Sequence, residues 1–419
     1  GVLAQQAGAA GFIEDSKATL GLRNFYINTD NRSGAANPSR NEEWGQGFDL
    51  RFISGYTQGA VGFGVDAIGL LGVRLDSGGG TNGAANGAAY GGTVFPSESN
   101  GEAVDNFSSL GLTAKAKISQ TELKLGTLQP KLPVIVTNDG RLLPQTFQGG
   151  QITSGEIKDL TLIGGQIEHV KGRNSSSNEQ LSIGGASART ANSNKFIYAG
   201  GDYKITKDLT AQYYYGNLED FYKQHFLGLV HNWSIGPGVL KSDLRYFNSS
   251  DDGLNGNTAT YYSNGNYNST ANGKGKVDNN LYSGLFLYTV AGHTFGGGYQ
   301  VSNGSSDFPW LNQGDGSSAY LTTDSQIAKF ARAGERTWQA RYSYDFAKVG
   351  VPGLTAGVVY LHGDDIDTRS PASTDSSEWE RDLTVGYVVP EGPLKNVGLM
   401  WKNATWRTNI PGQRDQDEN

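Results

Sequence analysis

The 419-residue chain contains no cysteine and only one methionine, and it has five histidines. Without cysteine the protein has no disulfide, no Cys-ligated zinc, no iron–sulfur cluster and no thiol nucleophile. The histidines form no His-Glu-x-x-His pair, and no Gly-x-Ser-x-Gly elbow occurs. The sequence therefore predicts no catalytic residues, no metal site and no cofactor, and we expect the protein not to be an enzyme.

Excess positive charge and long apolar runs are also missing. The 34 Lys and Arg residues are outnumbered by 41 Asp and Glu, which gives a net charge of −7 and no basic surface for nucleic acid. No run reaches the roughly 18 apolar residues of a transmembrane helix. A closed barrel of alternating strands is the other way to cross a bilayer. The small, apolar residues 1–7 resemble the tail of a cleaved secretory signal, which implies export.

Glycine and aromatic residues are abundant, with 60 Gly, 17 Phe, 21 Tyr and 7 Trp, and apolar and polar residues alternate along most of the chain. Phe48, Leu50 and Phe52, for example, alternate with Asp49 and Arg51. This period of two is typical of strands. The candidate strands are 17–28, 46–57, 60–76, 107–118, 121–128, 147–157, 160–171, 194–205, 208–218, 222–235, 239–248, 278–291, 293–302, 336–347, 354–363, 378–390 and 395–408.

Three features favour a transmembrane barrel over a water-soluble sandwich, in which the apolar face would be the core. The strands follow one another without helices, their apolar faces end in aromatic residues, and short turns alternate with long polar loops. The long connections are 29–45, 77–106, 129–150, 172–193, 248–277, 303–335, 364–377 and the residues from 408 onward. The low-complexity segment 77–106 is expected to be a mobile external loop.

The predicted fold is all-β: an up-and-down transmembrane antiparallel barrel that takes up residues 1–419 as a single domain. Bacterial single-chain barrels have an even number of strands, so we expect 18. The chain stops at a loop-like end, residues 417–419, where the eighteenth strand should begin, so we expect that strand to be absent. Segment 129–150 contains three prolines and an apolar run, which predicts a stiff constriction loop folded into the barrel.

Basic residues fall on the polar face of the predicted strands, which in a water-filled barrel is the lumen. Taken singly, each is more typical of a solvated strand face with an acidic neighbour. Taken together, they predict a track that passes an anion from site to site. They are Arg23, Arg51, Arg74, Lys115, Lys117, Lys124, Lys241, Arg245, Arg341 and Lys402.

Several motifs are spread over nearly the whole chain. They are Gly-Phe-Ile-Glu-Asp-Ser (11–16), Leu-Arg-Asn-Phe-Tyr (22–26), Thr-Gln-Gly-x-Val-Gly-Phe-Gly-Val-Asp-Ala (57–67), Arg-Leu-Leu-Pro-Gln-Thr (141–146), Leu-Glu-Asp-x-Tyr (218–222), Trp-Gln-Ala-Arg-Tyr (338–342), Gly-Val-Pro-Gly-Leu-Thr (350–355) and Gly-Pro-Leu-Lys-Asn-Val (392–397). In this order they resemble the motifs of the OprD-type outer-membrane carboxylate channels of pseudomonads.

The resemblance implies a bacterial outer-membrane porin that takes up small carboxylate nutrients by passive diffusion. It implies a monomeric pore, with loose homotrimers, embedded among outer-membrane lipid and lipopolysaccharide. A basic ladder would lead to an eyelet narrowed by the third and seventh long loops. Matched motif by motif, the ladder and eyelet positions are Arg23, Arg40, Arg141, Lys402 and Arg407.

The predicted pathway combines Arg141 and the facing loop 303–335 as the eyelet with a track of basic residues. Asp139 and Glu122 are expected to hold cations in position. The full set of expected pathway residues is Arg141, Asp139, Arg23, Arg40, Arg51, Arg74, Lys115, Lys124, Arg341, Lys402 and Arg407.

Departures from the family pattern bear on the substrate. Met400, Gly386 and Thr29 stand where the basic-amino-acid branch carries basic residues, and Lys329 and Phe330 lie where it carries an acid. These differences favour monocarboxylates, such as aromatic acids, over basic amino acids. A basic amino acid or peptide channel, a sugar-selective porin and, outside the porins, a secreted β-rich adhesin are the alternatives.

Overall fold

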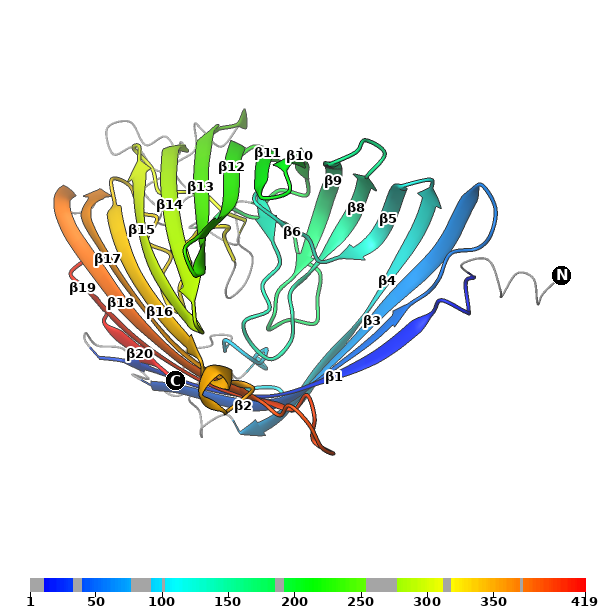
Figure 1. Cartoon of the computed structure of the whole chain (residues 1–419), viewed down its shortest axis with the longest axis horizontal. Helices are drawn as coiled ribbons and strands as arrows, with labels where there is room; N and C mark the ends of the chain where they lie inside the picture. Colours follow the sequence, from blue (N-terminus) through cyan, green and yellow to red (C-terminus); the bar gives the residue numbers. More distant parts are fainter. Residues whose placement is uncertain are drawn as a thin grey trace.

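Eighteen strands form one antiparallel sheet that closes on itself as a barrel, shown in Figure 1. The computed structural model describes residues 11–32, 40–76, 92–99, 102–184, 192–253, 277–311, 318–369 and 372–419. Each strand pairs with its neighbour in the chain, except that a small hairpin, β6–β7, separates β5 from β8. Among the described residues, no helix has the length and hydropathy of a membrane-spanning helix.

The barrel strands are β1 (Lys17–Asn31), β2 (Arg40–Ile53), β3 (Val61–Asp76), β4 (Asn106–Ile118), β5 (Thr121–Leu128), β8 (Thr146–Ser154), β9 (Leu160–Lys171), β10 (Phe196–Thr206), β11 (Leu209–Leu218), β12 (Tyr222–Ile235), β13 (Gly238–Asp251), β14 (Asp278–Val290), β15 (His293–Asn303), β16 (Arg336–Asp345), β17 (Leu354–Arg369), β18 (Ala372–Val388), β19 (Gly398–Thr408) and β20 (Gln416–Glu418). The remaining elements are β6 (Lys131–Leu132), β7 (Ile135–Val136) and the short 3-10 helix η3 (Phe346–Val349).

The eighteenth strand is β20, and it closes the ring. Its residue Glu418 pairs with Ala404 of β19 on one side and with Thr29 of β1 on the other. The barrel of 18 strands is thus confirmed, whereas the expectation of a loop-like end at residues 417–419 is wrong. Its sequence, Gln-Asp-Glu, has low strand propensity, and the two neighbouring strands impose the extended conformation.

All seventeen predicted strands occur, but the segment 364–377, expected to be a long loop, is mostly strand. Residues up to 369 extend β17, and β18 starts at 372. The ladder continues through irregular register between Gly363 and Thr368. This part of the hairpin is rich in polar residues, so no apolar alternation marked it.

The predicted alternation of faces is confirmed by the exposure of the apolar side chains. Leu22, Leu110 and Leu112 are 64%, 72% and 58% exposed on the outer surface. Trp233 and Trp401 are also exposed there. A barrel that presents apolar residues outward and polar residues inward is suited to a surrounding of lipid.

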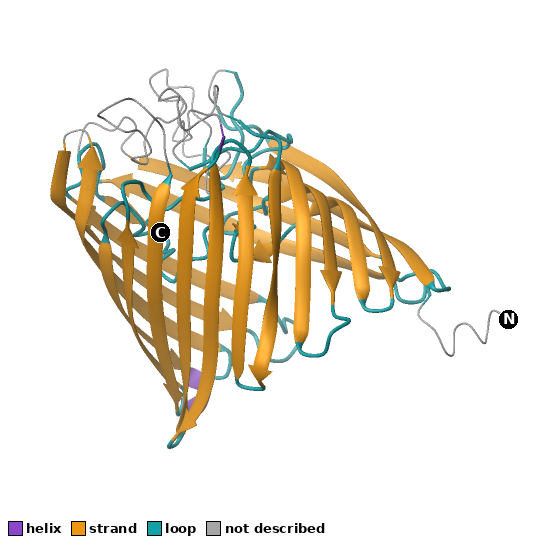
Figure 2. Cartoon of the chain, turned by 90° about the horizontal axis from the view of Figure 1, so that it is seen from above, coloured by secondary structure: helices purple, strands orange, loops and turns teal. Residues whose placement is uncertain are grey.

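The described long connections lie at one end of the barrel and inside it, while the short turns lie at the other end (Figure 2). The larger core cluster packs Val134, from between β6 and β7, and Phe308 against wall residues such as Phe196 and Phe247. The hydrophobic core therefore lies inside the barrel, between the inserted segments and the wall.

A second, smaller core cluster includes Val94 and Phe95, which are completely buried. The carboxylate of Glu43 on β2 accepts hydrogen bonds from the backbone N–H groups of Thr93, Val94 and Phe95. Most of segment 77–106 lies outside the described residues, but the expectation of a mobile external loop is wrong for residues 92–95. These hydrogen bonds and the burial of two apolar side chains hold them inside.

Candidate substrate pathway

The segment between β5 and β8, residues 129–145, spans the inside of the barrel and is called the constriction loop below. The predicted end of this loop at residue 150 is wrong, because residues 146–150 belong to β8. At one side, a Cβ on Gly216 of β11 would lie 2.9 Å from Val134 Cβ. At the other side, a Cβ on Gly45 of β2 would lie 2.7 Å from Leu142 Cδ2. Glycine at both wall positions lets the loop pack against opposite parts of the barrel, and β6 is visible inside the ring in Figure 1.

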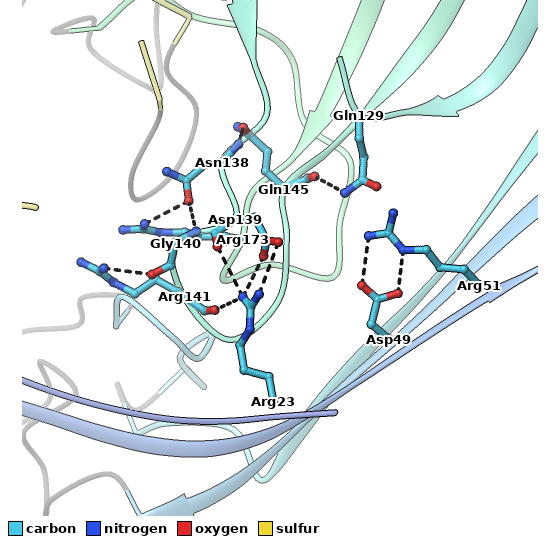
Figure 3. A network of polar contacts seen from close by, with 10 residues as sticks. All are labelled: Arg23, Asp49, Arg51, Gln129, Asn138, Asp139, Gly140, Arg141, Gln145 and Arg173. Atoms are coloured by element: carbon cyan, nitrogen blue, oxygen red, sulfur yellow. Dashed lines mark hydrogen bonds and ion pairs between the residues drawn. The ribbon is translucent and has the colours of Figure 1, made fainter. Parts of the chain in front are cut away.

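Arg23, on β1, binds the tip of the constriction loop, residues 138–141, through hydrogen bonds and an ion pair (Figure 3). Its Nη1 donates to Asp139 Oδ1 at 2.8 Å and to the Arg141 backbone oxygen at 2.6 Å. Weaker contacts reach the Asp139 backbone oxygen at 3.3 Å and Asp139 Oδ2 at 3.4 Å. Asp139, expected from the sequence to hold a cation in position, lies beside Arg23, and the pair fixes the backbone at Arg141.

Two more guanidinium groups gather at residues 138–141 (Figure 3). The Arg141 side chain is 14% exposed, and its Nη2 lies 3.7 Å from Glu418 Oε1. Arg173, which follows β9, is nearly buried, and its Nη1 donates to Asn138 Oδ1 at 3.2 Å. Arg173 was missed by the sequence analysis because it lies in an irregular connection, where no alternation assigns a side chain to the lumen.

The connection between β15 and β16, residues 304–335, is called the facing loop, and its described part meets the constriction loop. Asn138 Nδ2 donates to Ser318 Oγ at 3.0 Å, and Val136 forms a β-bridge with Ser318. The two loops that the sequence analysis expected to form the eyelet are therefore in direct contact. Lys329 of the facing loop lies 3.5 Å from Asp324, with its ammonium 5.2 Å from the centre of the Trp310 ring.

Carboxylates of β18 hold the facing loop against the wall. Asp382 Oδ2 accepts from the Gln326 backbone N–H at 3.0 Å, and the two oxygens of Glu380 accept from Ile327 N–H at 3.1 Å and Ala328 N–H at 2.8 Å. Glu380 is completely buried. Backbone N–H groups bound to carboxylates form strong hydrogen bonds, so this turn has a defined position.

Most of the strand residues expected in the basic track are paired with an acid. The pairs within the lumen are Arg51 with Asp49 (2.9 Å), Arg74 with Asp105 (2.7 Å), Lys115 with Asp66 (2.8 Å) and Lys124 with Glu122 (3.4 Å). Lys115 is only 6% exposed, and its ammonium lies 4.9 Å from the centre of the Tyr56 ring. These pairs reduce the net positive charge that the track presents to a solute.

Arg40 and Arg407 do not line the lumen, contrary to the prediction. Strand β2 directs Gly45 inward, and Arg40 is an odd number of residues away, on the outward face with the exposed Trp44. Arg407 likewise lies on the face of β19 that carries the exposed Trp401, and it pairs with Asp417 at 2.8 Å. Arg40 pairs with Glu42. The motif match assigned both residues without regard to the two-residue period of a strand.

Arg341 and Lys402 face inward, and within the described part of the chain neither forms an ion pair. Arg341 Nη2 donates to the Thr322 backbone oxygen at 2.5 Å and its Nε donates to Gln339 Oε1 at 2.6 Å. Lys402 is exposed.

A cavity of 280 Å³ lies beside Arg341, on the β13–β16 part of the wall. It is lined by Lys241, Asp243, Arg245, Leu285, Leu287, Leu321, Thr322, Asp324 and Arg341. Arg245 is bound to Asp243 through two hydrogen bonds of 2.9 Å and lies 3.8 Å from the centre of the Tyr320 ring. The cavity combines basic groups with leucine side chains.

Comparison with known proteins gives the family of this narrowed barrel of 18 strands. A family model described as outer membrane porin, OprD family, matches residues 10–419. The chain belongs to the OprD family of outer membrane porins. It is similar to the porin-like protein GalP of Pseudomonas putida, with 38% identity over 415 residues that cover 99% of this chain and 92% of GalP.

Two solved structures of Pseudomonas aeruginosa proteins are similar to this member of the OprD family. OccK8 (OprE) is 62% identical, with a TM-score of 0.88 over 98% of this chain and 97% of OccK8. OpdK with vanillate is 36% identical, with a TM-score of 0.84 over 97% of each chain.

The family and the barrel confirm three expectations from the sequence. The protein is a channel rather than an enzyme, it lies in the bacterial outer membrane, and its solutes are small molecules. The alternative of a secreted adhesin without a pore is wrong, because the chain is an OprD-family porin.

Proposed function

We propose that this OprD-family porin admits small monocarboxylates, aromatic acids in particular, by passive diffusion through one barrel. The observation that carries the proposal is the gathering of Arg23, Arg141 and Arg173 around residues 138–141 of the constriction loop. Guanidinium groups bind carboxylates in a bidentate, planar manner, and several such groups along a pore let an anion enter and leave.

Two lumen-facing basic residues without an ion pair among the described residues extend the positive charge along the proposed path. Lys402 and Arg341 form no ion pair within the described residues, so their charges add to those at the constriction. The cavity beside Arg341 offers leucine side chains next to the basic groups. That combination suits a molecule with an apolar ring and a carboxylate. OpdK, a 36% identical relative, has been solved with vanillate, which is an aromatic carboxylate.

Basic amino acids are the second candidate, and they require an acid for their cationic group. In the facing loop Asp324 is occupied by Lys329 at 3.5 Å. Burial raises the pKa of the Asp324 carboxyl above its ordinary value. The ion pair with Lys329 makes Asp324 less available to the cationic group of a solute, which favours monocarboxylates.

Salt dependence separates a sugar channel from a carboxylate channel. The passage of a sugar would change little with salt concentration, whereas the electrostatic attraction of a carboxylate to the basic residues weakens as salt screens the charges.

The test is the current through single channels of the purified protein in a planar bilayer, with benzoate or arginine added. Benzoate should interrupt the current and arginine should not. A guanidinium 4 Å from a carboxylate gains at most about 4 kcal/mol at an effective dielectric constant of about 20, before desolvation. After the cost of desolvation we expect Arg141 to contribute about 1.4 kcal/mol to benzoate binding. Arg141→Ala should therefore weaken the benzoate block about tenfold.

Arg51→Ala is the matched control, because Arg51 also faces the lumen but is neutralised by Asp49. Equal benzoate block in wild type, Arg141→Ala and Arg51→Ala would refute the carboxylate role of Arg141. Interruption by arginine but not benzoate would instead support the basic amino acid channel.

A further inference from the structure

Glu418, on the three-residue strand β20, contacts both loops that narrow the lumen. Its Oε1 accepts a hydrogen bond from Gln326 Nε2 of the facing loop at 3.1 Å. The same oxygen lies 3.7 Å from Arg141 Nη2 of the constriction loop. Its Oε2 accepts from Thr29 Oγ1 of β1 at 3.3 Å. One carboxylate therefore connects the constriction loop, the facing loop and the barrel wall.

Glu418 lies at the closure of the barrel, where its charge acts strongly on Arg141. Its backbone pairs with Thr29 and Ala404, and it is only 5% exposed, so its side chain points inward. The Arg141 side chain is 14% exposed. Salt and water screen such a poorly exposed pair much less than a surface pair.

The turn at Gln326 does not depend on Glu418 for its fold. The backbone N–H groups of Gln326, Ile327 and Ala328 are held by Asp382 and Glu380. Loss of the Glu418 contact therefore frees the Gln326 side chain while the backbone of the turn stays attached to β18.

We propose that Glu418 is a specificity-determining residue of the pore. Its carboxylate offsets part of the positive charge of Arg141, and the hydrogen bond from Gln326 Nε2 holds that carboxylate beside Arg141. The first effect sets how strongly the pore prefers anions, and the second sets how steady its narrowest part is. The inference rests on the proposed position of Arg141 in the solute path.

Two substitutions separate the two effects. E418Q removes the charge but keeps an oxygen that accepts from Gln326 Nε2. Q326A removes the hydrogen bond but keeps the charge. E391Q is the control, because Glu391 is an exposed residue of the turn between β18 and β19, far along the strands from β20.

The measurement is the reversal potential and the current noise of single channels in a gradient of potassium chloride, without carboxylate. We expect E418Q to raise the chloride-to-potassium permeability ratio at least about twofold, with a steady current, because one unit of negative charge leaves the constriction. Q326A should leave the ratio unchanged and increase the fluctuations of the open current. E391Q should resemble wild type in both.

An unchanged permeability ratio in E418Q would overturn the proposal, and so would a Q326A current as quiet as that of wild type. If E418Q does not assemble into a folded barrel, Q326A decides: increased fluctuations support the role of Glu418, and a quiet current overturns it. Because potassium chloride replaces the carboxylate, these results are independent of the benzoate block that tests the proposed function.

Discussion

Replacing Arg23 with alanine should loosen the constriction loop. Arg23 donates to Asp139 Oδ1 at 2.8 Å and to the Arg141 backbone oxygen at 2.6 Å. Hydrogen bonds of charged groups contribute about 1.5–3 kcal/mol each when shielded from water. The Arg23 side chain is 44% exposed, so we discount the sum to about 1–2 kcal/mol. At 1.4 kcal/mol per factor of ten, the displaced loop becomes about 5 to 30 times more populated.

The assay for Arg23→Ala is the fraction of time that a single channel spends in states of higher conductance. Arg51→Ala is the control, since Arg51 binds Asp49 of its own strand at 2.9 and 3.0 Å, and in Figure 3 no dashed line joins it to residues 138–141. If both variants spend the same time in the higher states, Arg23 does not hold the loop, and the reasoning is refuted.

Two further predictions concern packing and pH. A Cβ at Gly45 would lie 2.7 Å from Leu142 Cδ2 and 2.8 Å from Phe95 Cζ, so Gly45→Val should cost about 1–3 kcal/mol and lower the unfolding temperature in detergent; an unchanged temperature would contradict this. Hydrogen bonds from the Gln120 backbone N–H at 2.6 Å and from other donors lower the pKa of Glu156, so its stabilisation is present above the ordinary carboxyl pKa and is lost as the pH falls through the lower folded-state value. The difference in unfolding temperature between wild type and Glu156→Gln should therefore shrink from about pH 6 to about pH 3, and a constant difference would argue against this role.

The barrel was predictable because the alternation of apolar and polar residues identifies each strand independently of the others. An inward position and an outward position alternate with a period of two, so residues such as Leu110 and Lys124 could be assigned to a face from the sequence. The prediction was wrong for segment 364–377, because a strand with polar residues on both faces shows no apolar alternation. It was also wrong at 417–419, where two neighbouring strands decide the conformation.

The candidate pathway was predictable only in part. Arg141 and Arg23 were found from motifs, and alternation placed Arg341 and Lys402 inward. The same alternation, applied to Arg40 and Arg407, would have placed them outward. Arg173 and Glu418 carried no local signal, because each acquires its role from segments far away in the chain.

The sequence by itself determined that the chain forms a barrel, which face of each strand meets lipid, and which basic residues belong to the inner face. These properties depend on neighbours one or two residues away, so they can be inferred from short stretches of sequence. Only the tertiary structure decided which charges remain available to a solute. Ion pairs such as Arg23 with Asp139, and the contact of Glu418 with Arg141 and Gln326, depend on how the loops fold into the closed ring, and no spacing in the sequence specifies those distances.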